Sequence, residues 1–192
     1  NAMQVSPEDE TIQLRLALTL QALREFPASI KLLKKIPNAK VSLGEAYFAS
    51  GQYDEAIGTY TDLVQVDPEN AEHWYKLGRS LFETNEAAKA IPYLQQSLGL
   101  DPTQSVVWRT LATVYYSLED WGNSGTMLLK YLEMEPDHAA SHFALATCFD
   151  HLDNLEKALL HYNRFIQLDD GSNDARSFQV RQRVKALRLR LQ

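Results

Sequence analysis

Two histidines, His138 and His142, are the side chains of this sequence whose spacing most resembles a chemical site. Four residues apart on a helix, their imidazoles could bind one metal ion. A metal site needs further ligands, and the sequence identifies no third ligand beside the pair. We therefore favour a packed or surface pair of histidines over a metal centre, and we expect neither a metal nor a cofactor.

The single cysteine and the acidic pairs are the other reactive groups. Cys148 has no catalytic signature around it, so we favour a small, partly buried thiol. Glu119-Asp120 and Asp169-Asp170 fall in predicted turns, where carboxylates bond local backbone and solvent. The sequence contains no glycine-rich phosphate loop and no nucleophile motif. We expect no enzymatic activity, so binding becomes the question.

Three prolines define the elements that would position binding residues. Pro68, Pro102 and Pro136 recur at one constant interval, and each follows an acidic residue. A fixed period of about 34 residues indicates one supersecondary unit copied along the chain. When proline is placed at position 32 of a 34-residue repeat, the first repeat begins at Pro37. Position 8 is then always small: Gly44, Gly78, Ala112 and Ala146.

Each repeat reads as two helices joined by a turn. Positions 4, 7, 8 and 11 form one stripe of a first helix, and positions 20, 24 and 27 form one stripe of a second. Small residues at positions 8 and 20 let the helices approach closely. Ser50-Gly51 and Thr84-Asn85 supply turn residues, and the acid-proline pair ends the second helix.

This pattern resembles the tetratricopeptide repeat, and the match covers residues 37–170. The resemblance implies an all-α, right-handed superhelical solenoid of helix-turn-helix repeats with helical caps. The expected repeats span approximately 37–70, 71–104, 105–138 and 139–172, with a helical hairpin before them at 4–36 and a basic capping helix after them at 173–192. The fourth repeat departs at its end, where Asp169-Asp170-Gly171 replaces the acid-proline pair.

Both flanks also read as helical. Residues 1–3 look like a tag remnant and a start methionine, and Ser6-Pro7-Glu8-Asp9 is a good helix start. A second short helix is expected from Ala28 to Ile36. The last helix should begin after Ser172 or Asn173, with one apolar face made by Val180, Val184, Leu187 and Leu191.

Charge is unevenly distributed along the chain. The net charge is −6, but residues 175–192 contain six basic residues and no acidic ones, which leaves residues 1–174 at −12. An acidic body repels phosphates, so we expect no nucleic-acid partner. No apolar run is long enough for membrane insertion. One cysteine leaves the compartment open, and we favour a cytoplasmic location. For the basic helix we favour a structural role, in which its arginines complement the helix dipole and their stems cover apolar surface. The alternatives are binding to an anionic membrane surface, binding to an acidic partner, and self-association with the acidic body.

The resemblance implies that the first helices line a concave groove. Positions 2, 5, 9 and 12 should face it, and aromatic residues beside arginines are typical of interface hot spots. Partial burial against the neighbouring repeat is the alternative for position 12. The expected groove contacts are Phe48, Tyr75, Arg79, Phe82, Arg109, Thr113, Tyr116 and Phe143.

The resemblance also allows one specific exclusion. Chaperone-binding members of the family bind a C-terminal carboxylate with lysine, arginine and asparagine donors at fixed positions of three successive repeats. Counted from the first repeat, those positions hold Val41, Glu45, Lys76, Val106 and Thr110. Counted from the second repeat, they hold Tyr75, Arg79, Thr110, Ala140 and Ala144. We therefore expect no carboxylate-clamp chaperone binder. We expect a non-catalytic scaffold that binds a peptide or partner helix. The alternatives are a self-assembling structural protein that uses its end helices, forming homo-oligomers, and a regulatory or targeting segment of a larger enzyme.

Overall fold

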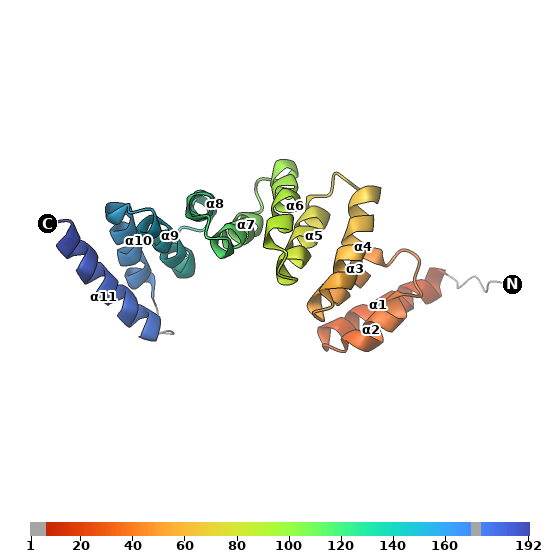
Figure 1. Ribbon diagram of the computed structural model, residues 1–192. Coiled ribbons are helices and arrows are strands. Elements are labelled where there is room, and N and C mark those ends of the chain that lie inside the picture. Colours follow the sequence, from red (N-terminus) through yellow and green to blue (C-terminus); the bar gives the residue numbers. More distant parts are fainter. Residues whose placement is uncertain (1–6, 170–173) are drawn as a thin grey trace. The chain divides into compact units, whose positions relative to one another are not determined.

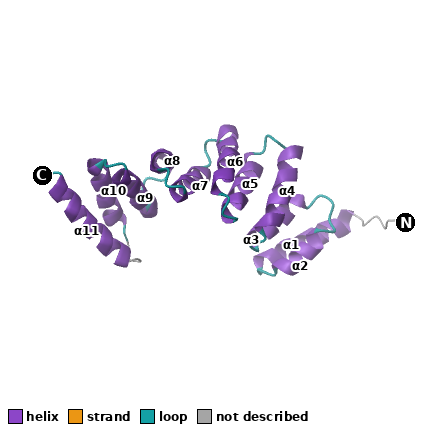
Figure 2. Ribbon diagram, viewed as in Figure 1, coloured by secondary structure: helices purple, strands orange, loops and turns teal. Residues whose placement is uncertain are grey.

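The computed structural model describes residues 7–169 and 174–192 of the 192-residue chain. Every regular element within these residues is a helix, as Figure 2 shows. None of these helices has the length and apolar run that crossing a membrane would need. The chain divides into two compact halves, residues 1–100 and residues 101–192, which we describe separately.

Each half is a row of helices in which neighbours in sequence pack side by side (Figure 1). The N-terminal half holds α1 (Pro7–Ala22), α2 (Phe26–Leu33), α3 (Lys40–Ala49), α4 (Tyr53–Val66), α5 (Ala71–Glu83) and α6 (Ala87–Leu100). The C-terminal half holds α7 (Ser105–Ser117), α8 (Trp121–Met134), α9 (Ala139–His151), α10 (Leu155–Leu168) and α11 (Asp174–Arg190). The four expected repeats correspond to the pairs α3–α4, α5–α6, α7–α8 and α9–α10.

The turn inside each repeat depends on one residue in the left-handed region. Position 15 has φ values of 78° at Gly51, 62° at Asn85, 58° at Glu119 and 55° at Asp153. The next backbone N–H in each turn donates to the carbonyl five residues earlier, for example Gln52 to Tyr47 at 2.9 Å. This arrangement satisfies the carbonyl groups at the end of the first helix and reverses the chain.

Position 8 is the point of closest approach between the helices of a repeat. A Cβ atom at residue 78 would lie 2.8 Å from Leu94 Cγ, and one at residue 44 would lie 3.0 Å from Tyr60 Cζ. The equivalent Ala112 and Ala146 are buried. The packing therefore requires the small residues that recur at this position.

In the second, third and fourth repeats, position 4 carries a ring whose N–H bonds the backbone that joins one repeat to the next. The indole Nε1 of Trp74 donates to the carbonyl of Pro68 at 2.8 Å, and that of Trp108 donates to the carbonyl of Pro102 at 2.9 Å. In the fourth repeat the Nε2 of His142 lies 2.9 Å from the carbonyl oxygen of Pro136. His142 thus supplies the same hydrogen bond as the tryptophans.

A buried row at positions 3, 7 and 10 repeats along the first helices. It includes His73, Leu77 and Ser80 of α5, then Val107, Leu111 and Val114 of α7, then Ser141, Leu145 and Cys148 of α9. In α11 the corresponding row is Val180, Val184 and Leu187, which packs on Tyr162 and Phe165 of α10. The step between rows equals the repeat period, except for the last step, which is five residues longer.

The flanks differ from the sequence prediction in detail. The short helix expected from Ala28 to Ile36 instead spans Phe26–Leu33, and its earlier start includes Pro27, which the first turn of a helix tolerates. Ile12 and Leu16 of α1 are exposed, as is Leu23 in the turn after it. Residues 1–6, the expected cap at Ser172 or Asn173, and Asp170 and Gly171 lie outside the described residues.

Candidate peptide-binding surfaces

In the N-terminal half, the expected groove residues gather around the ring of Phe48 on α3. The guanidinium of Arg79 lies 5.7 Å from its centroid and the Nζ of Lys76 lies 5.9 Å away. Arg79 Nε donates to Glu83 at 2.9 Å, and its Nη1 donates to the hydroxyl of Tyr75 at 3.4 Å. These contacts fix a half-buried aromatic ring beside two cations, an arrangement worth about 0.5–1 kcal/mol per cation–π pair at exposed sites.

Two other predicted residues of this half take less direct places. Tyr75 has a relative exposure of only 7%, so it positions Arg79 and offers little surface to a partner. Phe82 is half-buried on α5, three residues after Arg79. The structure therefore makes Phe48 and Arg79 the accessible centre of this cluster.

In the C-terminal half, a cavity of about 210 Å³ lies among α7, α8, α9 and the start of α11. Three of the four predicted groove residues of this half line it, namely Thr113, Tyr116 and Phe143. The other lining residues are Ala112, Ser124, Leu128, Ala144 and Arg176. The cavity is therefore apolar at its base, with one cation among its lining residues.

Arg109, the fourth predicted residue of this half, is exposed and does not line the cavity. Its guanidinium lies 5.8 Å from the ring centroid of Tyr131. Arg109 thus covers an aromatic ring of α8 and lies one helical turn before Thr113 on α7.

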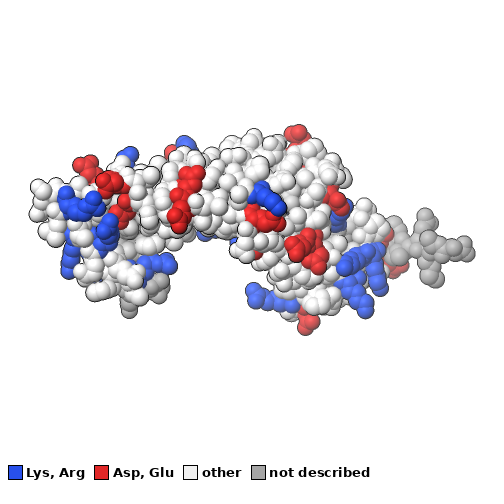
Figure 3. All heavy atoms as spheres, viewed as in Figure 1, with Lys and Arg blue, Asp and Glu red and all other residues white. Residues whose placement is uncertain are grey.

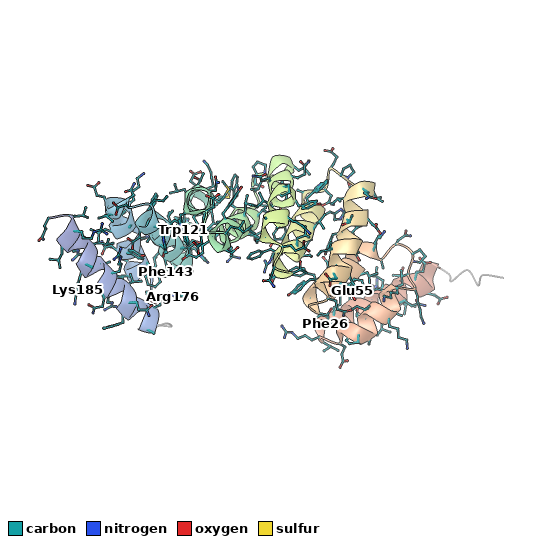
Figure 4. All side chains as sticks on the ribbon, viewed as in Figure 1. Phe26, Glu55, Trp121, Phe143, Arg176 and Lys185 are labelled. Atoms are coloured by element: carbon teal, nitrogen blue, oxygen red, sulfur yellow. The ribbon has the colours of Figure 1, made fainter. Side chains whose placement is uncertain are left out.

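The cation of the cavity, Arg176, comes from α11. Its guanidinium lies 5.2 Å from the ring centroid of Phe143, and Figure 4 shows the two side chains next to each other. Phe143 is held from behind by Phe165, whose ring centroid is 5.6 Å away. The sequence missed Arg176 because its basic neighbours were interpreted as one group; its seven-residue spacing from Arg183 was the available signal.

Arg183 and Arg190 continue this seven-residue row and fix α11 to the fourth repeat. Arg183 donates to Asp150 through Nε and Nη2, both at 2.6 Å, and Arg190 donates to Asp153 at 3.0 Å. The bidentate geometry raises the pKa of Arg183 through its hydrogen bond to Asp150. These pairs place the start of α11 where Arg176 reaches the cavity.

The two histidines with metal-like spacing point to different partners. His138 caps α9 and accepts a hydrogen bond from the backbone N–H of Ser141 at 3.1 Å. The Nδ1 of His142 lies 3.0 Å from the Nδ1 of His161. Burial, with His142 and Lys157 nearby, lowers the pKa of His161 to about 4. Nowhere in the part of the chain that the structure describes do three potential ligand side chains converge.

Cys148 lies in the core between α8 and α9. Its side chain is fully buried, and its Sγ lies 3.5 Å from the hydroxyl of Ser124. Burial raises the pKa of the thiol, which disfavours the reactive thiolate. The environment is that of a packing residue.

Comparison with known proteins identifies the family. The family model described as "Tetratricopeptide repeat" matches residues 41–105 and 109–173. The chain belongs to the tetratricopeptide repeat family, which confirms the predicted all-α solenoid class. Members of this family generally mediate protein–protein interactions, and the fold is typically a non-catalytic scaffold.

Individual relatives are distant. The BBSome complex member BBS4 homolog of Drosophila melanogaster is 21% identical over 183 residues, which covers 91% of this chain but only 38% of that protein. A crystal structure of MamA protein has a TM-score of 0.78 at 20% identity and covers 88% of this chain and 97% of that one. YrrB, whose structure is described as "a TPR protein with an unusual peptide-binding site", has a TM-score of 0.67 at 20% identity, covering 83% and 86%. At this identity the likeness of the structures shows the fold alone.

Proposed function

We propose that this protein is a non-catalytic interaction module that holds a peptide or partner helix against its first helices. The cavity of the C-terminal half carries the proposal. Its volume of about 210 Å³ is below the roughly 300–1,000 Å³ typical of small-molecule and cofactor pockets. A space of this size fits one side chain of a protein partner better than a free metabolite.

The chemistry of the lining defines the partner. Ala112, Leu128 and Phe143 favour a bulky apolar side chain, while Arg176 favours an acidic residue beside it. In the N-terminal half, Phe48 offers an aromatic ring beside two cations, Lys76 and Arg79, which also pair with Glu72 and Glu83 of α5 at 3.4 Å and 2.9 Å. The proposed ligand is therefore a segment in which apolar and acidic residues alternate.

The test begins with a peptide library displayed on phage and selected on the wild-type protein. We expect enriched peptides to carry a bulky apolar residue next to an acidic one. Thr113→Trp should fill the mouth of the cavity and weaken their binding at least tenfold. Thr126→Trp is the matched control, because both threonines are exposed and bond the carbonyl four residues earlier. Equal binding to both variants would refute the cavity as the site.

A second candidate function, self-assembly through the end helices, is favoured by one observation. Ile12 and Leu16 on α1 and Leu23 directly after it are exposed, and a second copy of the chain could cover this apolar surface. Sedimentation velocity of the wild type and of Leu16→Gln with Leu23→Gln tests this candidate. A concentration-dependent oligomer that dissociates in the variant would support it, and a wild-type monomer at all concentrations would exclude it.

A further inference from the structure

The surface concerned is the outer face of α11, formed by Phe178, Arg181, Lys185 and Arg188. We infer that this face binds an acidic α-helix of a partner protein. Phe178 is 63% exposed, and all three cations are exposed. None of the three forms an ion pair with any residue in 7–169 or 174–192. Figure 3 shows basic atoms along α11, and in Figure 4 Lys185 projects away from α10.

Register identifies what this face would do in a complete repeat. The buried row of α11, Val180, Val184 and Leu187, corresponds to the buried row of α9, Ser141, Leu145 and Cys148. Each residue of the α11 row lies one repeat period plus five residues after its counterpart in α9. By the same step, Arg181, Lys185 and Arg188 correspond to His142, Ala146 and Phe149.

Those three residues form the face on which α9 packs against its own second helix, α10. The ring centroids of His142 and Phe149 lie 5.2 Å and 5.7 Å from that of His161 on α10, and Ala146 shares a core cluster with Tyr162. The outer face of α11 is thus the side of a first helix that receives another helix, so we identify a helix as its occupant.

A second helix of the regular kind does not fit at Lys185. This residue occupies position 8, where a mere Cβ at residue 78 would lie 2.8 Å from Leu94. A lysine there holds an incoming helix further away and presents an ammonium group to it. The occupant must therefore carry acidic residues to pair with the three cations.

The N-terminal half contains an example of such a contact. Lys40 stands at position 4 of the first repeat, the place that Arg181 takes in α11. Its Nζ pairs with Asp62 on the second helix of the same repeat, α4, at 2.7 Å. A cation on this face of a first helix is thus already matched by a carboxylate of the helix packed against it.

The six basic residues of α11 consequently separate into two rows. Arg176, Arg183 and Arg190 face the fourth repeat, where they contact Phe143, Asp150 and Asp153. Arg181, Lys185 and Arg188 are not needed for that attachment. The inferred partner lies on the opposite side of α11 from the cavity row, so this inference does not depend on the groove proposed above.

The test uses a fluorescein-labelled, alanine-based helical peptide of about 20 residues, long enough to be helical alone. One face carries alternating leucine and glutamate, and a second peptide has glutamine in place of glutamate. By fluorescence anisotropy we expect the glutamate peptide to bind the protein at least tenfold more tightly than the glutamine peptide. This preference should decrease from 50 to 300 mM salt because screening weakens exposed charge pairs.

Paired charge reversals assign the site. Arg181→Glu with Lys185→Glu should abolish the preference for glutamate, whereas Lys31→Glu with Lys35→Glu should leave it within twofold of wild type. In the control pair, Lys31 lies on α2 and Lys35 lies in the turn after it; both are exposed, and their reversal changes the net charge equally. Circular dichroism checks that both variants remain folded. Equal losses in the two variants, or no preference in the wild type, would overturn the inference.

Two further measurements distinguish other occupants. Binding to phosphatidylserine vesicles that the Arg181→Glu and Lys185→Glu variant loses, without peptide binding, would replace the partner helix with an anionic membrane. A dimer in sedimentation velocity that this variant dissociates would replace it with a second copy of the chain. Either result would overturn the inference as stated.

Discussion

Gly78 offers the sharpest test of the packing that holds the repeats together. A Cβ atom there would lie 2.8 Å from Leu94 Cγ and 3.2 Å from the backbone oxygen of Ala90. Leu94 is fully buried, so its side chain has little room to move away. Gly58 provides the matched control, because it lies inside α4 and a Cβ there meets nothing within 4 Å.

The expected magnitudes follow from two opposing effects. Replacing a helical glycine with alanine stabilises the helix by about 0.8–1 kcal/mol at either site. Only Gly78→Ala also forces an overpacked contact, which costs about 1–3 kcal/mol. Gly58→Ala should therefore raise the free energy of unfolding by about 1 kcal/mol, and Gly78→Ala should leave it unchanged or lower it by up to about 2 kcal/mol.

The difference between the two variants, about 1–3 kcal/mol, is the quantity to measure. Urea and thermal unfolding followed by circular dichroism give it directly, and Gly58→Ala should raise Tm by about 2–4 °C. Gly44→Ala should lie between them, since its nearest neighbour is the ring of Tyr60 at 3.0 Å. If Gly78→Ala stabilised the protein as much as Gly58→Ala, position 8 would not be a steric requirement, and the exclusion of a regular helix at Lys185 would lose its basis.

Three further predictions concern other parts of the chain. Glu119→Gly should stabilise the protein by about 0.5–1 kcal/mol in urea melts, because residue 119 has a φ of 58° that glycine adopts without strain. Burial and neighbouring positive charge lower the pKa of His161 in the folded protein to about 4. Between this pH and the unfolded pKa of about 6.5, the unfolded chain binds a proton at His161 that the folded protein does not bind. Stability should be full above pH 6.5 and fall by about 1–2 kcal/mol towards pH 4, allowing for partial solvent screening, and His161→Gln should remove this part of the slope. Cys148, fully buried with a raised pKa, should react with a thiol reagent in native protein at least a hundredfold more slowly than in urea.

The repeat architecture could be predicted because its signals are local and are repeated. Pro68, Pro102 and Pro136 fixed a register, and the helix boundaries of the four repeats follow it closely. Proline and a left-handed residue in the turn act on the neighbouring backbone alone, so their positions mark helix ends whatever packs nearby. The family match confirms the fold that this register predicted.

The exposure of the expected groove residues could be predicted only in part, because exposure depends on neighbours that the period does not specify. Tyr75 shares position 5 with Phe143, yet Tyr75 is buried beneath Arg79 while Phe143 lines a cavity. Likewise Arg109 covers Tyr131 instead of lining the cavity. Position within the repeat places a residue on a helix face, and only the contacts across helices decide whether a partner could reach it.

The buried row of α11 lies five residues later than the repeat period would place it, and the apolar residues of α11 explain this offset. A step of one repeat period from α9 would bury Ala175, Gln179 and Gln182, whereas the observed longer step buries Val180, Val184 and Leu187. Burying three aliphatic side chains instead of two glutamines favours the longer step by several kcal/mol, at about 1.5–3 kcal/mol for each large apolar side chain.

At about 100° per residue, a shift of five residues rotates the helix surface by about 140°. This rotation turns Arg176 and Arg183 towards the fourth repeat and leaves Arg181 and Lys185 on the side where a second helix would lie. The two separate rows of cations are therefore a consequence of this change in register. In the variant Gln179→Leu with Gln182→Leu, the residues one repeat period after Leu145 and Cys148 would be apolar. They would compete with Val180, Val184 and Leu187 for the buried face of α11, which should weaken the Arg183–Asp150 attachment.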